Sequence, residues 1–76
     1  MQSQSVLKLG LYRHTKSGKL YRVLGLAMHT ETEESLVVYE PQYDSEIKFF
    51  VRPVDMFLET VVIDGVARPR FEFIHA

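Results

Sequence analysis

The residues best suited to chemistry in this sequence are two histidines and an acid. His14 and His29 stand at the two ends of a long strand-like run, and Glu31 follows His29 by two positions. Two imidazoles and one carboxylate form a set that binds divalent transition metals, so a small metal-dependent hydrolase is one alternative. The H-x-E spacing also occurs in zinc deaminases, but those enzymes need a P-C-x-x-C segment as well. The chain has no cysteine, which excludes a deaminase.

Other catalytic patterns find no support. Ser17, Ser35 and Ser45 fall in predicted loops, outside the G-x-S-x-G or S-x-x-K setting of a nucleophile. The four glycines are scattered along the chain, so it has no glycine-rich phosphate loop. No H-E-x-x-H spacing supports a metal centre either. The sequence therefore favours a non-enzymatic protein, and we assign it no catalytic residue, no metal ligand and no cofactor.

Aromatic side chains beside cationic ones indicate a binding surface instead. Rings stack on bases or other planar groups while Arg and Lys meet phosphates, which is how single-stranded nucleic acid is held. The isoelectric point near 6.3 is low for a dedicated nucleic-acid domain, which more often exceeds about 9. Two ligand classes therefore stay open, a nucleic acid and a small anionic or aromatic molecule. The candidate ligand-binding residues are Tyr12, Arg13, His14, Lys16, His29, Glu31, Tyr39, Arg52 and Arg70.

Charge is divided unevenly along a chain whose net charge is −1. Residues 1–30 contain basic side chains and no acid, whereas acids outnumber bases between residues 31 and 64. If the basic residues share one face, that face attracts anions despite the balanced total. The alternative is that basic and acidic side chains pair across neighbouring strands of a sheet, so that their charges cancel. Arg52 or Arg70 paired with Glu59 would belong to such a network.

The elements that must position these residues are strands. Short apolar and aromatic runs are separated by turn residues, and Gly18 and Asp64-Gly65 are typical of hairpin turns. Pro53 favours one short helical turn over residues 53–58. These features predict an all-β chain of five to six short antiparallel strands, forming an SH3-like or alternatively an OB-like barrel. The predicted strands cover residues 9–14, 19–29, 36–40, 47–52, 59–63 and 70–74.

Alternation along residues 19–29 predicts which side chains this strand exposes. Tyr21 and Val23 would face the core, because the opposite register turns Arg22 inward at a high desolvation cost. The even positions Leu24, Leu26 and Met28 would then form an apolar patch on the outer face. Small chains without disulfides or metals often gain stability by self-association. A homo-oligomeric interaction domain that uses this patch is therefore an alternative function.

The 76 residues limit the protein to one small domain. Residues 1–8 are expected to form a flexible N-terminal segment and residues 9–76 a single small barrel. The longest uncharged apolar stretch, residues 23–28, is far shorter than the roughly 20 residues that span a membrane. The first residues also lack the basic region of an export signal. We therefore expect a cytoplasmic protein with no membrane partner.

Five segments of the chain occur in an order that identifies a resemblance. They are Gly10-x-Tyr12-Arg13-His14-x-Lys16, Tyr21-x-Val23-x-Gly25-x-Ala27-x-His29-Thr30-Glu31-Thr32, Leu36-Val37-Val38-Tyr39, Val51-Arg52-Pro53-x-x-Met56-Phe57-x-Glu59 and Pro69-Arg70-Phe71. Over residues 10–74 the chain resembles the bacterial family catalogued as domain of unknown function 1653 (DUF1653). The resemblance implies a small all-β fold and a bacterial origin, and it implies no activity. Its polar motif positions are Arg13, His14, Lys16, His29, Glu31, Thr32, Arg52, Glu59 and Arg70.

Overall fold

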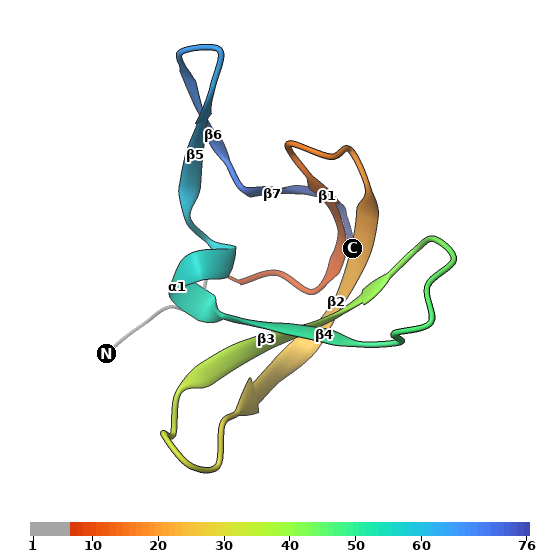
Figure 1. Cartoon of the computed structure of the whole chain (residues 1–76), viewed down its shortest axis with the longest axis vertical. Helices are drawn as coiled ribbons and strands as arrows, with labels where there is room; N and C mark the ends of the chain where they lie inside the picture. The colour runs from red at the N-terminus through yellow and green to blue at the C-terminus, as the bar shows by residue number, and fades with distance from the viewer. Residues whose placement is uncertain (1–6) are drawn as a thin grey trace.

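The computed structural model describes residues 7–76 and confirms the all-β class (Figure 1). Within these residues, seven strands and one short helix follow one another. Their bounds are β1 Gly10–His14, β2 Leu20–Met28, β3 Ser35–Pro41, β4 Phe50–Pro53, α1 Val54–Phe57, β5 Thr60–Ile63, β6 Val66–Pro69 and β7 Phe71–His75.

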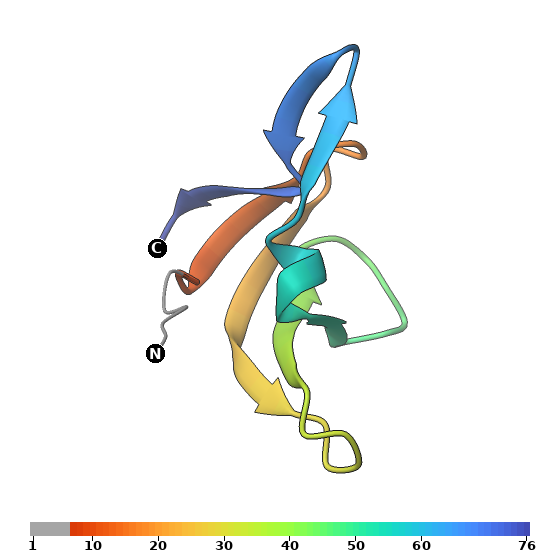
Figure 2. The ribbon, with the colours of Figure 1, turned by 90° about the vertical axis from the view of Figure 1, so that its left-hand side faces the viewer.

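The strands form two antiparallel sheets. The larger sheet has the order β4-β3-β2-β1-β7, and the smaller one pairs β5 with β6. Figure 2 shows the β5–β6 hairpin projecting beyond one end of the larger sheet. The predicted barrel is not closed, because the chain leaves β4 through α1 and this hairpin, and no ladder joins β4 to β7 in the sheets of residues 7–76. The fold is therefore a curved sheet with two open edges.

The hairpin turn predicted at Asp64-Gly65 is present. Both residues have positive φ angles, 52° and 76°, as the two central residues of a type I′ turn require. The strand on its far side, β6, was not among the predicted strands, because its four residues are all exposed and end in Pro69. Pro69 is tolerated there because β6 lies at the edge of a two-stranded sheet.

Strand β2 carries an irregularity that breaks its alternation. Val23 lies opposite Tyr39 and Gly25 lies opposite Val38, so Leu24 is an extra residue in the strand. Such a bulge shifts all later side chains by one position. Leu26 consequently lies opposite the buried Val37, on the same face of the sheet as the core. The prediction that the even positions all share the outer face is therefore wrong beyond the bulge.

The core is mainly aromatic and lies on the concave side of the larger sheet. Helix α1 begins after Pro53, as the sequence predicts, and directs the side chain of Phe57 into this core, where it is 1% exposed. The Phe57 ring stacks on that of Phe71, with centroids 4.2 Å apart. The short turn thus closes the open side of the sheet. The buried side chains are Tyr12, Val23, Val37, Tyr39, Phe57 and Phe71.

The N-terminal segment expected to be flexible lies mostly outside the described residues, which begin at Leu7. Leu7 packs against the core, and the carbonyl of Lys8 accepts a 2.7 Å hydrogen bond from the hydroxyl of Tyr12. The division at residue 9 stays a prediction. No helix within residues 7–76 is long and apolar enough to cross a membrane, and the cytoplasmic location stays a prediction.

Candidate functional site

Arg52 occupies the concave side of the larger sheet. It lies on β4 opposite Val37, so its side chain shares the face of the core. Its Nε donates a 3.3 Å hydrogen bond to the hydroxyl of Tyr39, and the guanidinium carbon lies 5.4 Å from the centroid of the Phe71 ring. No carboxylate lies within 4 Å of this guanidinium among residues 7–76. Four N–H groups on its terminal nitrogens therefore remain for a ligand or water.

His14 lies beside the same phenylalanine. It ends β1 opposite Phe71 of β7, and its ring meets the Phe71 ring edge-on, with centroids 5.0 Å apart. Its Nδ1 lies 3.0 Å from the hydroxyl of Ser17 and accepts a 3.3 Å hydrogen bond from the Ser17 N–H. Burial lowers the pKa of His14, and the positive charges of Arg52, Arg70 and Lys16 lower it further.

Arg70 completes the group from the junction between β6 and β7. Its terminal nitrogen donates a 3.0 Å hydrogen bond to a carboxylate oxygen of Glu59, so the predicted pairing with Glu59 is made by Arg70 and not by Arg52. Its Nε is buried and has no hydrogen-bond partner among residues 7–76. A buried donor without a partner costs roughly 1–3 kcal/mol unless water or a ligand accepts from it. We refer to His14, Arg52 and Arg70 as the cationic cluster.

Two tyrosines lie next to the cationic cluster. The ring of Tyr21 packs against Phe71 with centroids 5.9 Å apart, and its hydroxyl lies 3.0 Å from the hydroxyl of Tyr43. Burial raises the pKa of Tyr21 to about 12, and its hydrogen bond with Tyr43 contributes in the same direction. Both rings are partly exposed, so they provide aromatic surface at the edge of the cluster.

The raised pKa of Tyr21 predicts a late step in an alkaline titration. An unfolded tyrosine ionises near pH 10, so the stability that Tyr21 contributes is complete below pH 10 and is lost as the pH rises towards 12. Tyr21→Phe should remove the step near pH 12 from the phenolate absorbance. Tyr43→Phe, which removes the hydrogen-bond partner, should move that step to lower pH. A Tyr21→Phe titration that superimposes on the wild-type curve would contradict this assignment.

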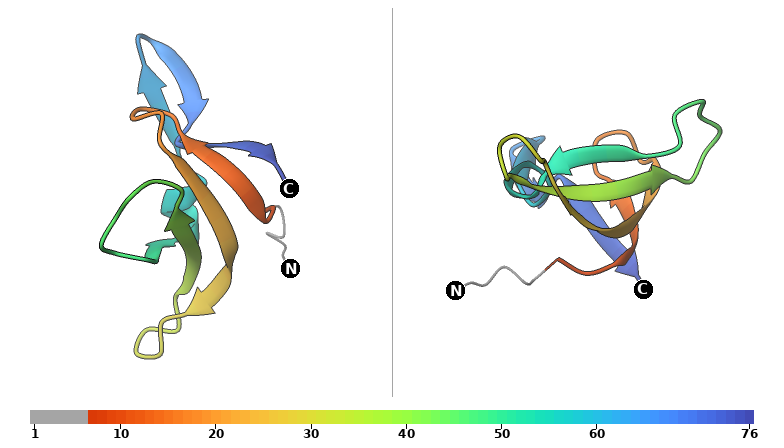
Figure 3. Two further views of the ribbon diagram at one scale, coloured as in Figure 1. Left: turned by 90° about the vertical axis from the view of Figure 1, so that its right-hand side faces the viewer. Right: turned by 90° about the horizontal axis from the view of Figure 1, so that it is seen from below.

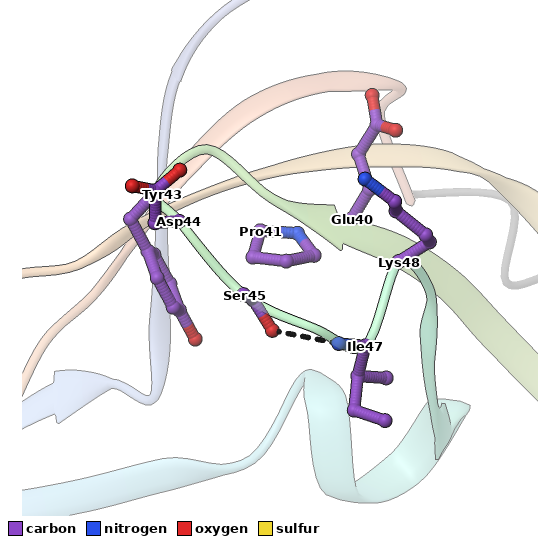
Figure 4. A pocket seen from close by; sticks show the side chains of 7 residues that line it. All are labelled: Glu40, Pro41, Tyr43, Asp44, Ser45, Ile47 and Lys48. Atoms are coloured by element: carbon purple, nitrogen blue, oxygen red, sulfur yellow. Dashed lines mark hydrogen bonds between the residues drawn. The ribbon is translucent and has the colours of Figure 1, made fainter.

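A small hollow lies beside Tyr43, within the loop that joins β3 to β4 (Figure 4). Its volume is about 200 Å³, and a 3.1 Å hydrogen bond from the Ile47 N–H to the Ser45 hydroxyl holds the loop at its margin. The sequence prediction missed it, because residues 42–48 form no motif and the hollow contains none of the candidate ligand residues. The lining residues are Glu40, Pro41, Tyr43, Asp44, Ser45, Ile47 and Lys48.

Several candidate residues lie away from the cationic cluster. Tyr12 is a core residue, 5% exposed, whose hydroxyl is bonded to the Lys8 backbone. Arg13 points to the opposite face and forms an ion pair with Glu72 of β7. Lys16 lies in the exposed turn between β1 and β2 and acts on His14 through its charge. Of the candidates, the structure thus brings together His14, Tyr39, Arg52 and Arg70, with Lys16 at the margin.

His29 and Glu31 lie in the loop between β2 and β3, at the other end of β2 from His14 (Figure 3). The Nδ1 of His29 accepts backbone hydrogen bonds from Glu31, at 3.1 Å, and from Thr32, at 3.4 Å. This motif therefore closes the loop. The two histidines do not approach each other, so the metal site of the hydrolase alternative is not formed, and residues 7–76 contain no group of three ligands suited to a metal ion.

Comparison with known families decides the identity of the chain. Residues 10–73 match the sequence model of a family described as a protein of unknown function, DUF1653. The chain belongs to this family. The DUF1653 chain is also similar to the crystal structure of a DUF1653 protein from Bordetella bronchiseptica, with 34% sequence identity and a TM-score of 0.86. The match covers 95% of this chain and 92% of that one. No curated protein matches the chain.

The apolar side chains of Leu24, Leu26 and Met28 are all exposed in this DUF1653 domain. The bulge places Leu26 on the core-facing side of the sheet, beyond the packed region. Self-association through these three residues stays a prediction.

Proposed function

We propose that this DUF1653 domain is a non-enzymatic binding module whose cationic cluster holds a small anion. The observation that carries the proposal is the environment of Arg52. Its guanidinium lies over Phe71 with no carboxylate partner in the described chain, and its charge acts on His14 together with that of Arg70. An arginine charge held near other positive charges, with no carboxylate of its own, is unfavourable to the fold, and such groups are typical of functional sites.

The donors of the cationic cluster suit an anion. The fork of terminal N–H groups on a guanidinium matches the oxygens of a phosphate or carboxylate. The partly exposed rings of Tyr21 and Tyr43 offer a surface for a planar group attached to that anion. A nucleic acid remains an alternative ligand that supplies both groups.

The proposal predicts that Arg52→Gln weakens anion binding about tenfold or more, because a hydrogen bond to a charged group contributes roughly 1.5–3 kcal/mol. Binding is measured by calorimetry and by NMR shifts of His14 and Tyr21 at low salt, with pyrophosphate and a short single-stranded oligonucleotide as probes. Arg52→Lys should weaken binding less, since it keeps the charge and loses the fork.

Arg68→Gln is the matched control, because Arg68 lies exposed on β6 and its substitution changes the charge by the same amount. It should leave binding unchanged, and thermal melts should show that both variants fold. Equal weakening by the two substitutions would indicate non-specific charge attraction and contradict the proposal. The absence of binding by both probes at millimolar concentration would also contradict it. Tighter binding of the oligonucleotide than of pyrophosphate would favour nucleic acid as the ligand.

A further inference from the structure

The hydrogen bonds of His14 allow it to exist with or without a proton. In the neutral ring Nδ1 accepts from the Ser17 N–H at 3.3 Å, which leaves the hydrogen on Nε2. The hydroxyl of Ser17 lies closer to Nδ1, at 3.0 Å, and a hydroxyl can act as donor or acceptor. When Nδ1 gains a proton, it can donate to this oxygen in place of the longer backbone contact. The turn therefore accommodates the charged ring, which then has N–H donors on both nitrogens.

The charges that face His14 come from each element packed around it. Lys16 lies in the adjacent turn, Arg52 on β4 and Arg70 at the junction between β6 and β7, and all three are positive. Neither nearby carboxylate pairs with His14, because Glu59, which precedes β5, pairs with Arg70, and Glu72 of β7 pairs with Arg13. In the free protein these positive charges oppose a proton on His14. A bound anion would reverse that opposition.

We infer that the anion is a tetrahedral dianion of the phosphate class and that His14 takes up one proton from solvent when this anion binds. This inference rests on the proposed function of the cationic cluster. It is carried by N–H donors on two separate strands, Nε2 of His14 on β1 and the terminal nitrogens of Arg52 on β4, with the positive charge of Arg70 beside them. A planar carboxylate is satisfied by one guanidinium fork, whereas a phosphoryl group offers three terminal oxygens and up to two charges.

Sulfate is the probe that tests this inference, because it is tetrahedral and keeps both negative charges between pH 5.5 and 7.5. The dissociation constant for sulfate should fall about tenfold from pH 7.5 to pH 5.5, since uptake of one proton changes affinity by up to tenfold per pH unit. Calorimetry in two buffers of different ionisation enthalpy should show net proton uptake on binding. Acetate, a planar monoanion, should bind at least about tenfold more weakly than sulfate.

Two matched variants assign the proton. His14→Asn keeps a side-chain acceptor for the Ser17 N–H, so the turn should remain folded, and it should abolish the pH dependence of sulfate binding. His29→Asn replaces the other histidine whose Nδ1 accepts backbone hydrogen bonds, at the far end of β2, and should leave the pH dependence intact. Loss of the pH dependence in His29→Asn instead would overturn the assignment to His14.

The failures of the two proposals are distinguishable. Suppose that sulfate and acetate bind with similar affinity, that this affinity is the same at both pH values, and that Arg52→Gln weakens the binding of both. This result would overturn the inference and leave the proposed binding function standing. If pyrophosphate, sulfate and acetate all fail to bind, both proposals are overturned.

Discussion

Replacement of Phe57 by alanine is expected to destabilise the domain by about 3–5 kcal/mol. Phe57 is 1% exposed and stacks on Phe71, and its ring also contacts Tyr12 and Tyr39 at centroid distances of 5.3 and 5.4 Å. The cavity left by the ring would lie in the centre of a core that contains only six buried hydrophobic side chains among residues 7–76. Because small domains have unfolding free energies of about 5–15 kcal/mol, this loss is a large fraction of the total.

Urea unfolding followed by circular dichroism measures this effect. Met56→Ala is the control, because Met56 belongs to the same helix and is 48% exposed. Its substitution should change the unfolding free energy by less than about 1 kcal/mol. Phe57→Leu should lie between the two, since it leaves a smaller cavity. If Phe57→Ala lowered the unfolding free energy by less than Met56→Ala does, α1 would not close the core.

Replacement of Gly10 by alanine is the second change with a large expected effect. Gly10 has a φ of +139°, and a Cβ atom there would lie 2.6 Å from the carbonyl oxygen of His75 and 2.7 Å from the Cα of Ala76. The backbone strain alone costs about 1–3 kcal/mol. The overlap adds to this cost, because its neighbours are backbone atoms that can move only if the end of β7 shifts away from β1.

Gly18→Ala separates the contributions of backbone strain and of atomic overlap to the loss of unfolding free energy in Gly10→Ala. Gly18 has a φ of +77° with no atom within 4 Å of the added Cβ, so its substitution introduces strain without overlap. Urea unfolding should therefore show a larger decrease in unfolding free energy for Gly10→Ala than for Gly18→Ala. Hydrogen exchange should show weakened protection of the β7 amides in Gly10→Ala only. Equal losses for the two variants would argue against close packing of the C-terminal strand on β1.

The strands other than β6, and the short helix, could be predicted because their signals are local. Asp64-Gly65 and Gly18 favour positive φ, and Pro53 starts a turn that places Phe57 inward. The extra residue at Leu24 could not be foreseen, since a bulge depends on the partner strand and leaves no mark on composition. The prediction of a closed barrel was wrong for a similar reason. Whether the two edge strands of a sheet pair depends on tertiary contacts between distant segments, which local sequence does not show.

The candidate site was predicted only in part. Successive residues of a strand point to opposite faces, so Arg13 shares a face with neither Tyr12 nor His14. The structure accordingly pairs Arg13 with Glu72 away from the core. His29 has the residue type of a ligand but closes a loop through backbone hydrogen bonds, a role that only local geometry reveals.

The pairing of β1 with β7 determines when the cationic cluster forms during folding. Arg13 and Glu72, which pair across these strands, are 59 residues apart in sequence. Closing so long a loop costs entropy before any contact offsets it, and folds rich in such distant pairings form slowly. His14 lies on the earlier of these strands and Phe71 on the later. The cluster therefore exists only after the two ends of the chain have paired, so on the proposed function the binding of an anion would report that folding is complete.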